Sequence, residues 1–263
     1  MKRLAAGLVA LLVAAGCGLG GGGSDPEPIT AAPAAVAPSD EVTEEPVPQE
    51  STPPSKAPVS PKSKPKPKKP KKPKPTKTED PNNFQMPACA TKEGKAVSKA
   101  KAKAALTAAA GRTYWPGTAP QLKVPKRLVL ATAWHESGWT SNYVNCDGGR
   151  GLMQVMPDTE AFINQRFEKA YDSHDYRENA TLGANYLAWL TYAFGHAYFH
   201  DNFDLSAGKC RNHSSMCLLN MVISGYNVGR GAVDDAYADK KLPNPAYVDS
   251  VRSLLKSCYC DRY

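Results

Sequence analysis

The sequence lacks the motifs of two common classes of hydrolase. In the stretch WHESGW (residues 134–139), Trp139 stands where a His-Glu-x-x-His zinc peptidase needs its second histidine, so the stretch has no metal-ligand pair. No Gly-x-Ser-x-Gly elbow is present, which argues against an α/β-hydrolase serine nucleophile. We therefore expect no metal and no other cofactor.

Three further patterns are missing. Sustained alternation of apolar and polar residues is absent, so no substantial β-sheet is expected. Only Cys258 and Cys260 lie close together in the sequence, and no CxxC pair accompanies them, which argues against structural zinc. The basic residues form no nucleic-acid-reading motif, and an export signal removes that partner, so nucleic acid is excluded.

The N-terminus has the pattern of an export signal. Lys2 and Arg3 precede an apolar segment that is too short to span a membrane. Residues 14–17, Ala-Ala-Gly-Cys, resemble the lipobox of bacterial lipoproteins. We expect residues 1–16 to be a lipoprotein signal peptide and lipid on Cys17 to anchor the protein to the outer face of the cytoplasmic membrane. The alternative is an ordinary signal with an incidental cysteine.

The other six cysteines form an even set, which favours disulfides in an exported chain. They are Cys89, Cys146, Cys210, Cys217, Cys258 and Cys260. Because disulfides explain all six cysteines, we do not expect a catalytic cysteine among them. We predict only the pair Cys210–Cys217, which closes a short local loop, and leave the other pairings open.

Residues 17–83 read as a lipidated N-terminus followed by a disordered linker. Large apolar side chains are almost absent from residue 24 onward, so this segment cannot form a core. Proline and lysine dominate residues 56–77, and both proline and like-charge repulsion extend a chain. A spacer is the simpler interpretation. The lysines could also bind anionic wall polymers.

Residues 84–263 are long enough for one hydrophobic core. This part has 21 basic and 16 acidic residues, which suits an anionic wall or membrane surface. Apolar periodicity and capping residues predict a mainly α domain without internal repeats, and we expect a monomer. The predicted helices span 94–110, 124–137, 157–167, a run that Asn179 caps, 214–224 and 245–258.

Glu136 occupies an unusual place for a carboxylate. It lies in the last turn of a predicted helix, where the macrodipole disfavours negative charge, and Trp134 and Trp139 flank it in the sequence. Both the dipole and desolvation by the indoles raise a carboxyl pKa. A glutamic acid that stays protonated near neutrality can donate a proton to a glycosidic oxygen. A solvated surface glutamate is the alternative.

Two later motifs, GLMQVMP (residues 151–157) and SGYNVG (residues 224–229), follow the Glu136-Ser137 pair in order. Together the three resemble the signatures of the soluble lytic transglycosylase family, whose members cleave peptidoglycan and have a goose-type lysozyme fold. NATLGANYL (residues 179–187) is also similar to a helix of that family, while Gly225 replaces the usual alanine. The resemblance extends from residue 124 to about residue 255. It implies a mainly α, lysozyme-like catalytic domain.

The resemblance also implies roles for single residues. Glu136 would be the one acid and base, and Ser137 would orient it or the substrate. Met153 and Gln154 would line the sugar cleft, and Tyr226 and Asn227 would hold the carboxyl group and an adjacent sugar. Structural roles are the alternatives: core filler for the methionine, a core aromatic for the tyrosine and a turn former for the asparagine.

In this family, one glutamate protonates the bond between N-acetylmuramic acid and N-acetylglucosamine and then draws the muramyl 6-hydroxyl onto C1. Ordinary glycosidases need two carboxylates.

Asp147 precedes GLMQ, roughly where goose-type lysozymes position water with an aspartate, although a loop-turn role beside Cys146 is the simpler interpretation. A hydrolytic muramidase that uses Glu136 with Asp147 and a non-catalytic glycan-binding module are therefore the alternatives. The expected partners are peptidoglycan strands and, through the anchor, the membrane.

Overall fold

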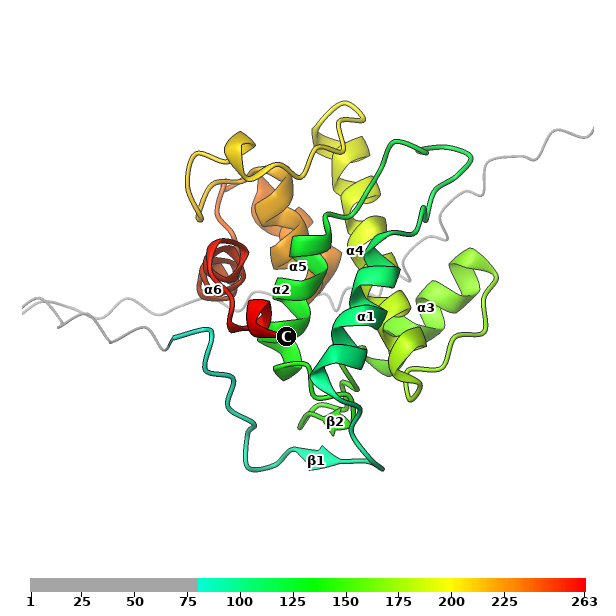
Figure 1. Ribbon diagram of the computed structural model, residues 1–263. Helices are drawn as coiled ribbons and strands as arrows, with labels where there is room; N and C mark the ends of the chain where they lie inside the picture. The colour runs from blue at the N-terminus through cyan, green and yellow to red at the C-terminus, as the bar shows by residue number, and fades with distance from the viewer. Residues whose placement is uncertain (1–79) are drawn as a thin grey trace, which may run out of the picture. The chain divides into compact units, whose positions relative to one another are not determined.

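The computed structural model describes residues 80–263. The predicted signal peptide, Cys17 and residues 17–79 of the predicted linker lie outside the described residues. The described part forms six α-helices, two two-residue strands and two short 3-10 turns (Figure 1). The helices are α1 (Lys99–Ala110), α2 (Lys126–Ser137), α3 (Pro157–Phe167), α4 (Tyr176–Tyr198), α5 (Leu218–Tyr237) and α6 (Pro245–Lys256).

The mainly α prediction is confirmed, because the sheet consists only of β1 (Thr91–Lys92) and β2 (Tyr143–Val144). The two strands pair antiparallel, with Thr91 opposite Val144. None of the helices between residues 80 and 263 is both long enough and apolar enough to span a bilayer.

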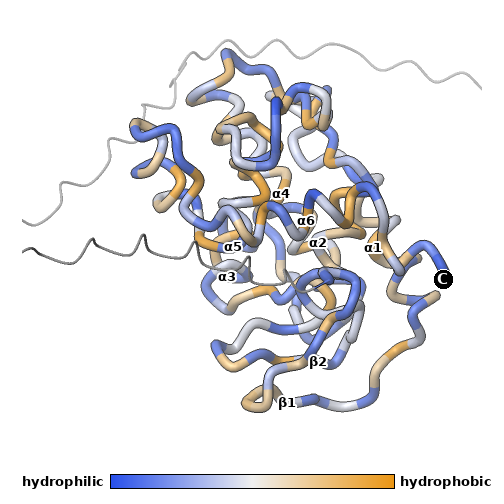
Figure 2. Tube along the Cα trace, turned by 90° about the vertical axis from the view of Figure 1, so that its left-hand side faces the viewer, coloured by the Kyte–Doolittle hydropathy of each residue, from blue (hydrophilic) through white to orange (hydrophobic). Residues whose placement is uncertain are grey.

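Helix α4 lies at the centre of the domain. It has 23 residues and packs against α1 and α5, while α2 packs against α1 and α6 (Figure 1). Hydrophobic residues follow the helices in Figure 2, whereas the connecting segments are mostly hydrophilic. The largest fully buried side chains include Trp139, Phe194, Met153, Ile163 and Leu187. Each such side chain contributes about 1.5–3 kcal/mol to the free energy of unfolding.

Several helix boundaries differ from the prediction, among them the start of α1, which lies at Lys99 rather than residue 94, the start of α4 and both ends of α5. Helix α4 begins at Tyr176, because the side chain of Asp175 accepts hydrogen bonds from the backbone N–H groups of Arg177 and Glu178 at 2.8 and 3.0 Å. The prediction that Asn179 caps this helix is wrong. Helix α5 continues beyond the apolar run that predicted it, although Gly229 interrupts its helical geometry with φ +81°.

An N-terminal arm precedes α1 and is fastened at two places. Asn82 accepts a hydrogen bond from the Trp134 indole at its carbonyl (3.1 Å) and another from the Tyr259 backbone N–H at its side chain (2.7 Å). Asn82, which the sequence assigned to the linker, therefore contacts the helical domain. A disulfide, Cys89–Cys146, then joins the arm to the loop after β2.

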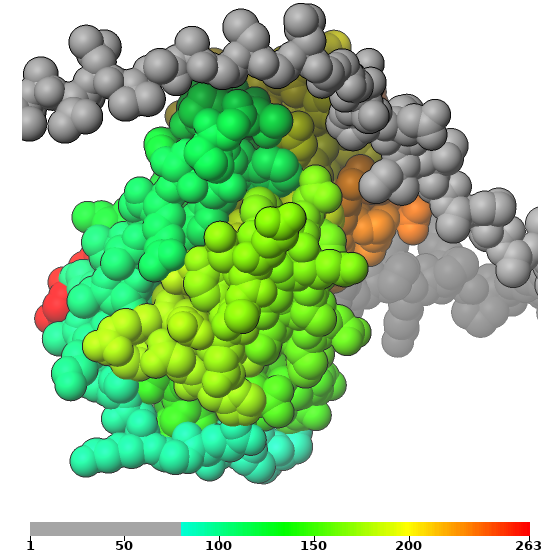
Figure 3. Space-filling model, turned by 90° about the vertical axis from the view of Figure 1, so that its right-hand side faces the viewer, coloured from blue at the N-terminus to red at the C-terminus, as the bar shows by residue number. Residues whose placement is uncertain are grey.

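Two further disulfides lie near the C-terminal half of the domain. The predicted pair Cys210–Cys217 is confirmed, and Cys258 pairs with Cys260. Figure 3 shows another face of the domain, where α1, the segment 111–125 and α3 reach the surface.

Candidate active site

Glu136 lies in the last turn of α2, as predicted, and is half-buried. The helix ends here because Gly138 adopts a left-handed conformation (φ 54°) and its N–H bonds to the Trp134 carbonyl at 2.8 Å. Burial raises the pKa of Glu136 to about 7, and a hydrogen bond from the Tyr247 hydroxyl to Oε1 opposes that rise. Both the neutral acid and the carboxylate are therefore accessible near neutral pH.

Trp134 and Trp139, which flank Glu136 in the sequence, pack against each other. Their rings meet edge-to-face at 5.4 Å, and the Trp139 indole donates to the Leu130 carbonyl at 3.1 Å. Residues two apart on a helix lie on different faces, so Trp134 and Glu136 leave α2 in different directions. Desolvation of Glu136 by the indoles stays a prediction.

The charge of Glu136 affects the pKa of three tyrosines, which come from different elements. Burial raises the pKa of Tyr226 in α5 and of Tyr247 in α6 well above the ordinary value, and the charge of Glu136 raises both further. Burial and Glu136 also raise the pKa of Tyr143 in β2. All three hydroxyls are therefore neutral hydrogen-bonding groups around the carboxyl group.

Ser137 connects α2 to the GLMQ loop. Its hydroxyl lies 2.8 Å from the carbonyl oxygen of Leu152 and 3.2 Å from that of Ala133, and the side chain is fully buried. Its single proton is donated to these backbone carbonyls rather than to the carboxyl group of Glu136. The position of Ser137 favours holding the loop against the helix end.

Met153 contributes its backbone to the site. Its carbonyl accepts a hydrogen bond from the Tyr226 hydroxyl at 2.7 Å, and its N–H donates to Oδ1 of Asn179 at 2.9 Å. Its side chain is fully buried beside Gly183 of α4. The structure thus places this side chain in the core, as the alternative interpretation had it, and not on a cleft wall.

Asn179 fixes the GLMQ loop from the side of α4. Its side-chain amide donates to the carbonyl oxygens of Arg150 (2.8 Å) and Ser173 (3.0 Å), and its oxygen accepts from Met153. The side chain is fully buried. The sequence marked this position as a cap and as the first residue of a family-like helix, and its contact with the GLMQ loop was missed.

Gln154 has the left-handed backbone conformation, with φ 49°. Its side-chain N–H group donates to the carbonyls of Gly151 (2.8 Å) and Tyr143 (3.2 Å). Its Oε1 is buried and has no hydrogen-bond partner among residues 80–263. A buried acceptor without a partner is uncommon in proteins and points to an absent donor.

Asn227 lies at the surface and connects α5 with α6. Its Oδ1 accepts a hydrogen bond of 2.8 Å from Asn244, whose side chain also bonds to Ser224. Asn244 immediately precedes α6, which carries Tyr247. These bonds place Tyr247 relative to α5. Tyr247 belongs to no motif that the sequence analysis recognised.

Aromatic rings extend from the site along α4. Tyr186 lies 5.6 Å from Tyr226 and stacks with Trp189 at 5.7 Å, and Phe162 meets Trp189 edge-to-face at 4.7 Å. The rings are half-exposed. The three-residue spacing of Tyr186 and Trp189 on one helix is the signal for this row in the sequence.

Asp147 is exposed, and its N–H bonds to Oδ1 of Asn145 at 2.9 Å, which forms an Asx turn. Its carboxylate makes no hydrogen bond or ion pair within the described part of the chain. The adjacent Cys146 is joined to Cys89. The structure thus favours the loop-turn role for Asp147.

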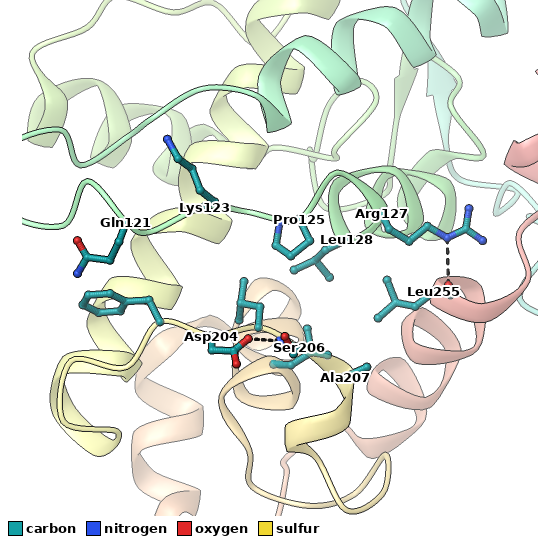
Figure 4. A pocket seen from close by; sticks show the side chains of 12 residues that line it. Gln121, Lys123, Pro125, Arg127, Leu128, Asp204, Ser206, Ala207 and Leu255 are labelled. Carbon is teal, nitrogen blue, oxygen red and sulfur yellow. Dashed lines mark hydrogen bonds between the residues drawn. The ribbon is translucent and has the colours of Figure 1, made fainter.

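A cavity of about 510 Å³ lies at the opposite end of α2 (Figure 4). Pro125 and Leu128 line it, and Arg127 donates to the carbonyl of Leu255 at 3.1 Å. Glu136 is about 13 Å further along the helix. This cavity is separate from the site around Glu136. Between residues 80 and 263, no group of three or more His, Cys, Asp or Glu side chains is placed to hold a metal ion.

Comparison with known proteins gives one family. The family described as "Transglycosylase SLT domain" matches residues 113–246, a range that includes Glu136, the GLMQ loop and Tyr226. Among solved structures, the 70 kDa soluble lytic transglycosylase SLT70 from Escherichia coli is 21% identical, with a TM-score of 0.35, over 55% of this chain. The match spans 21% of that protein's length. No curated protein matches the chain.

Proposed function

The chain belongs to the transglycosylase SLT domain family, and on that premise we propose that it is a peptidoglycan lytic transglycosylase. It cleaves the β-1,4 bond between N-acetylmuramic acid and N-acetylglucosamine and forms a 1,6-anhydromuramyl end. Glu136 is its single acid and base. The observation that carries the proposal is the pKa of Glu136, raised by burial to about 7 and balanced by the hydroxyl of Tyr247.

In the first step Glu136 acts as an acid. Its neutral form donates a proton to the glycosidic oxygen while the bond from that oxygen to muramyl C1 breaks, and N-acetylglucosamine leaves with a hydroxyl group. Positive charge develops at C1. The carboxylate that remains is stabilised by the hydrogen bond from Tyr247, which favours the charged form.

In the second step the same carboxylate acts as a base. It takes the proton of the muramyl 6-hydroxyl as the oxygen forms its bond to C1, and the acid is restored without any water entering the reaction. Ordinary glycosidases require a second carboxylate, but this mechanism does not. The free, surface-exposed carboxylate of Asp147 agrees with this scheme.

The surroundings of Glu136 suit a sugar chain. Tyr186 and Trp189 offer aromatic faces, and the unpartnered Oε1 of Gln154 suits a hydroxyl or acetamido N–H donor. Asn227, which follows Tyr226 in α5, is exposed. Ser137 and Met153 support this surface from within the domain, through a side-chain and a backbone hydrogen bond respectively.

Peptidoglycan lies outside the cytoplasmic membrane, so the proposed substrate agrees with an exported protein. The signal peptide, the lipid on Cys17 and wall binding by the lysines of residues 56–77 stay predictions, because these residues lie outside the described part. A monomer also stays a prediction.

Digestion of purified peptidoglycan tests the proposal. The full chain should release anhydromuropeptides, which mass spectrometry finds lighter by one water molecule than hydrolysed products. Glu136→Gln should release none, whereas Glu168→Gln, an exposed glutamate outside the site, should match the parent. Products with reducing ends only would support the muramidase alternative. Binding without any lysis by the parent would support the glycan-binding module.

A further inference from the structure

Three adjoining cavities form one groove on the face shown in Figure 3. Their volumes are about 330, 550 and 330 Å³. Arg112 lines the first two cavities, and Tyr114 and Phe167 line the last two, so the cavities share walls. We name this feature the α1–α3 groove, because it runs from α1 past the segment 111–118 to the end of α3.

The α1–α3 groove lies on a different side of α4 from Glu136. Asn185 lines the groove, whereas the next residue, Tyr186, packs toward Tyr226. Consecutive residues of a helix point about 100° apart. None of the three tyrosines around Glu136 lines the groove.

Aromatic side chains form the walls of the groove. Trp115 stacks on Tyr192 at 4.0 Å and meets Phe167 edge-to-face at 5.2 Å, which holds its ring in place. Tyr114 and Tyr171 line the central cavity. Rigid aromatic surfaces with a few polar groups are the usual lining of small-molecule sites, and they offer planar contact area to the apolar face of a sugar ring.

The charges that line the groove have one sign. They come from five cations and no carboxylate: Lys101, Arg112, Arg166, Lys169 and Arg177. Arg166 lies over the Trp115 ring at 5.3 Å. Arginine in particular recognises carboxylates through paired N–H groups, so the groove is complementary to a ligand that carries carboxylates.

Two buried polar atoms in the groove have no protein partner. Asn185 is only 3% exposed, lines the central cavity, and its Oδ1 has no hydrogen-bond partner among the described residues. The indole N–H of Trp115, which lines the third cavity, is also buried and unpartnered within residues 80–263. Buried polar groups normally find a partner, since each unpaired one costs about 1–3 kcal/mol. The Asn185 oxygen and the Trp115 indole N–H are thus suited to a ligand whose groups both donate and accept hydrogen bonds, as hydroxyl and acetamido groups do.

We propose that the α1–α3 groove is a second, non-catalytic binding site for a carboxylate-bearing glycan, namely muramyl units of a peptidoglycan strand that carry no stem peptide and so keep a free carboxylate. The groove itself does not depend on the function proposed for Glu136, but the identity of its occupant rests on it. Sugar rings lie on Tyr114 and against the edge of Trp115, their acetamido groups bond to Asn185, and Arg112 and Lys169 bind the carboxylates. The site holds the enzyme on the polymer while Glu136 acts elsewhere.

Nuclear magnetic resonance of the full chain tests the site. The protein carries Glu136→Gln to prevent turnover, and the indole N–H signals of Trp115 and Trp189 report on the groove and on the active-site face respectively. The ligand is a soluble oligosaccharide of alternating N-acetylglucosamine and N-acetylmuramic acid. Both indole signals should shift, and a chitin oligosaccharide without carboxylates should shift the Trp115 signal at a concentration ~tenfold higher or more.

Asn185→Leu separates binding from folding. Leucine has a similar size and removes the unpaired oxygen, so the melting temperature should be unchanged or higher. The Trp115 response should weaken ~tenfold, while the Trp189 response stays as in the parent. Arg112→Ala should weaken the same response, and Arg211→Ala, an exposed arginine outside the groove, should not.

The outcomes are distinct. A shift of Trp189 alone overturns the inference and leaves the proposed function intact. A Trp115 shift that survives Asn185→Leu, or that the chitin oligosaccharide or inorganic polyphosphate produces equally well, overturns a specific site for muramyl sugars. A ligand that shifts neither signal contradicts both the groove and the active-site proposal.

Discussion

The hydroxyl of Tyr247 donates a hydrogen bond to Oε1 of Glu136 across 111 positions of sequence. Burial favours the neutral acid, whereas this bond favours the carboxylate, and the pKa of Glu136 settles at about 7. A group that must first give a proton and then take one is best placed near the working pH. The bonds of Asn244 to α5 hold the start of α6 and so fix the approach of Tyr247.

Tyr247→Phe should move the pH dependence of activity. The variant loses the bond that lowers the pKa of Glu136, so the pKa rises and the acid stays protonated to higher pH. The alkaline limb of kcat/KM, expected at about pH 7 in the parent, should therefore shift upward by about one pH unit. The maximal rate should fall ~10- to 100-fold, because the developing carboxylate loses its donor.

Tyr259→Phe is the matched control, since this tyrosine is 39% exposed and its hydroxyl makes no hydrogen bond to the described residues. Its pH profile should coincide with that of the parent. Should Tyr247→Phe lower the rate without moving the alkaline limb, the hydroxyl would act only by positioning.

Glu136→Gln should stabilise the protein in a pH-dependent way. The pKa of Glu136 is raised from 4.5 to about 7 on folding, so the native state binds more protons than the unfolded state between these values. Stability contributed by this residue therefore falls as pH rises through that window. Glutamine can still accept the Tyr247 bond and carries no charge. The variant should gain about 1–3 kcal/mol above pH ~8 and little below pH ~4.5.

Chemical denaturation at several pH values measures this difference. Glu168→Gln serves as control, because Glu168 is exposed, and its effect should not vary across the same pH range. A constant gain for Glu136→Gln at all pH values would contradict a raised pKa.

The sequence predicted helices best where a local signal marks an end. Helix α3 has the predicted bounds because Pro157 occupies its first turn, and α2 ends as predicted because Gly138 takes a left-handed conformation. Helix α5 was predicted too short, since its later residues face solvent and lose the apolar pattern. The true cap of α4, Asp175, was overlooked in favour of Asn179.

In the candidate site, the motifs pointed to segments that the structure brings together, but not always to the atoms that meet there. Glu136 was singled out through its place in α2. Ser137 and Met153 belong to the site, yet they act through buried bonds to the backbone, which a motif does not reveal. Tyr247 was missed because only tertiary packing of α6 brings it to Glu136, and no local pattern in the sequence encodes that contact.

Asp147→Asn tests the hydrolytic alternative directly. Asparagine also suits an Asx turn, and the carboxylate of Asp147 makes no hydrogen bond or ion pair in the described structure, so folding should be unaffected. We expect activity within about twofold of the parent and the same anhydromuropeptides by mass spectrometry. A loss of ~100-fold or more would show that the carboxylate takes part in the reaction and would favour a water-using muramidase.

Gly183→Ala should damage the site through the core. A Cβ at this position would lie 2.5 Å from Cβ of Met153, an atom that cannot move without its backbone. The loop would shift at the carbonyl that accepts the Tyr226 bond. Overpacking should cost about 1–3 kcal/mol of stability, and displacement of the loop ~10- to 100-fold in kcat.

Gly231→Ala, in α5 with nothing within 4 Å of the added Cβ, should instead stabilise by about 0.5–1 kcal/mol with unchanged kcat. Equal behaviour of the two variants in melting and turnover would show that the GLMQ loop does not depend on contact with α4.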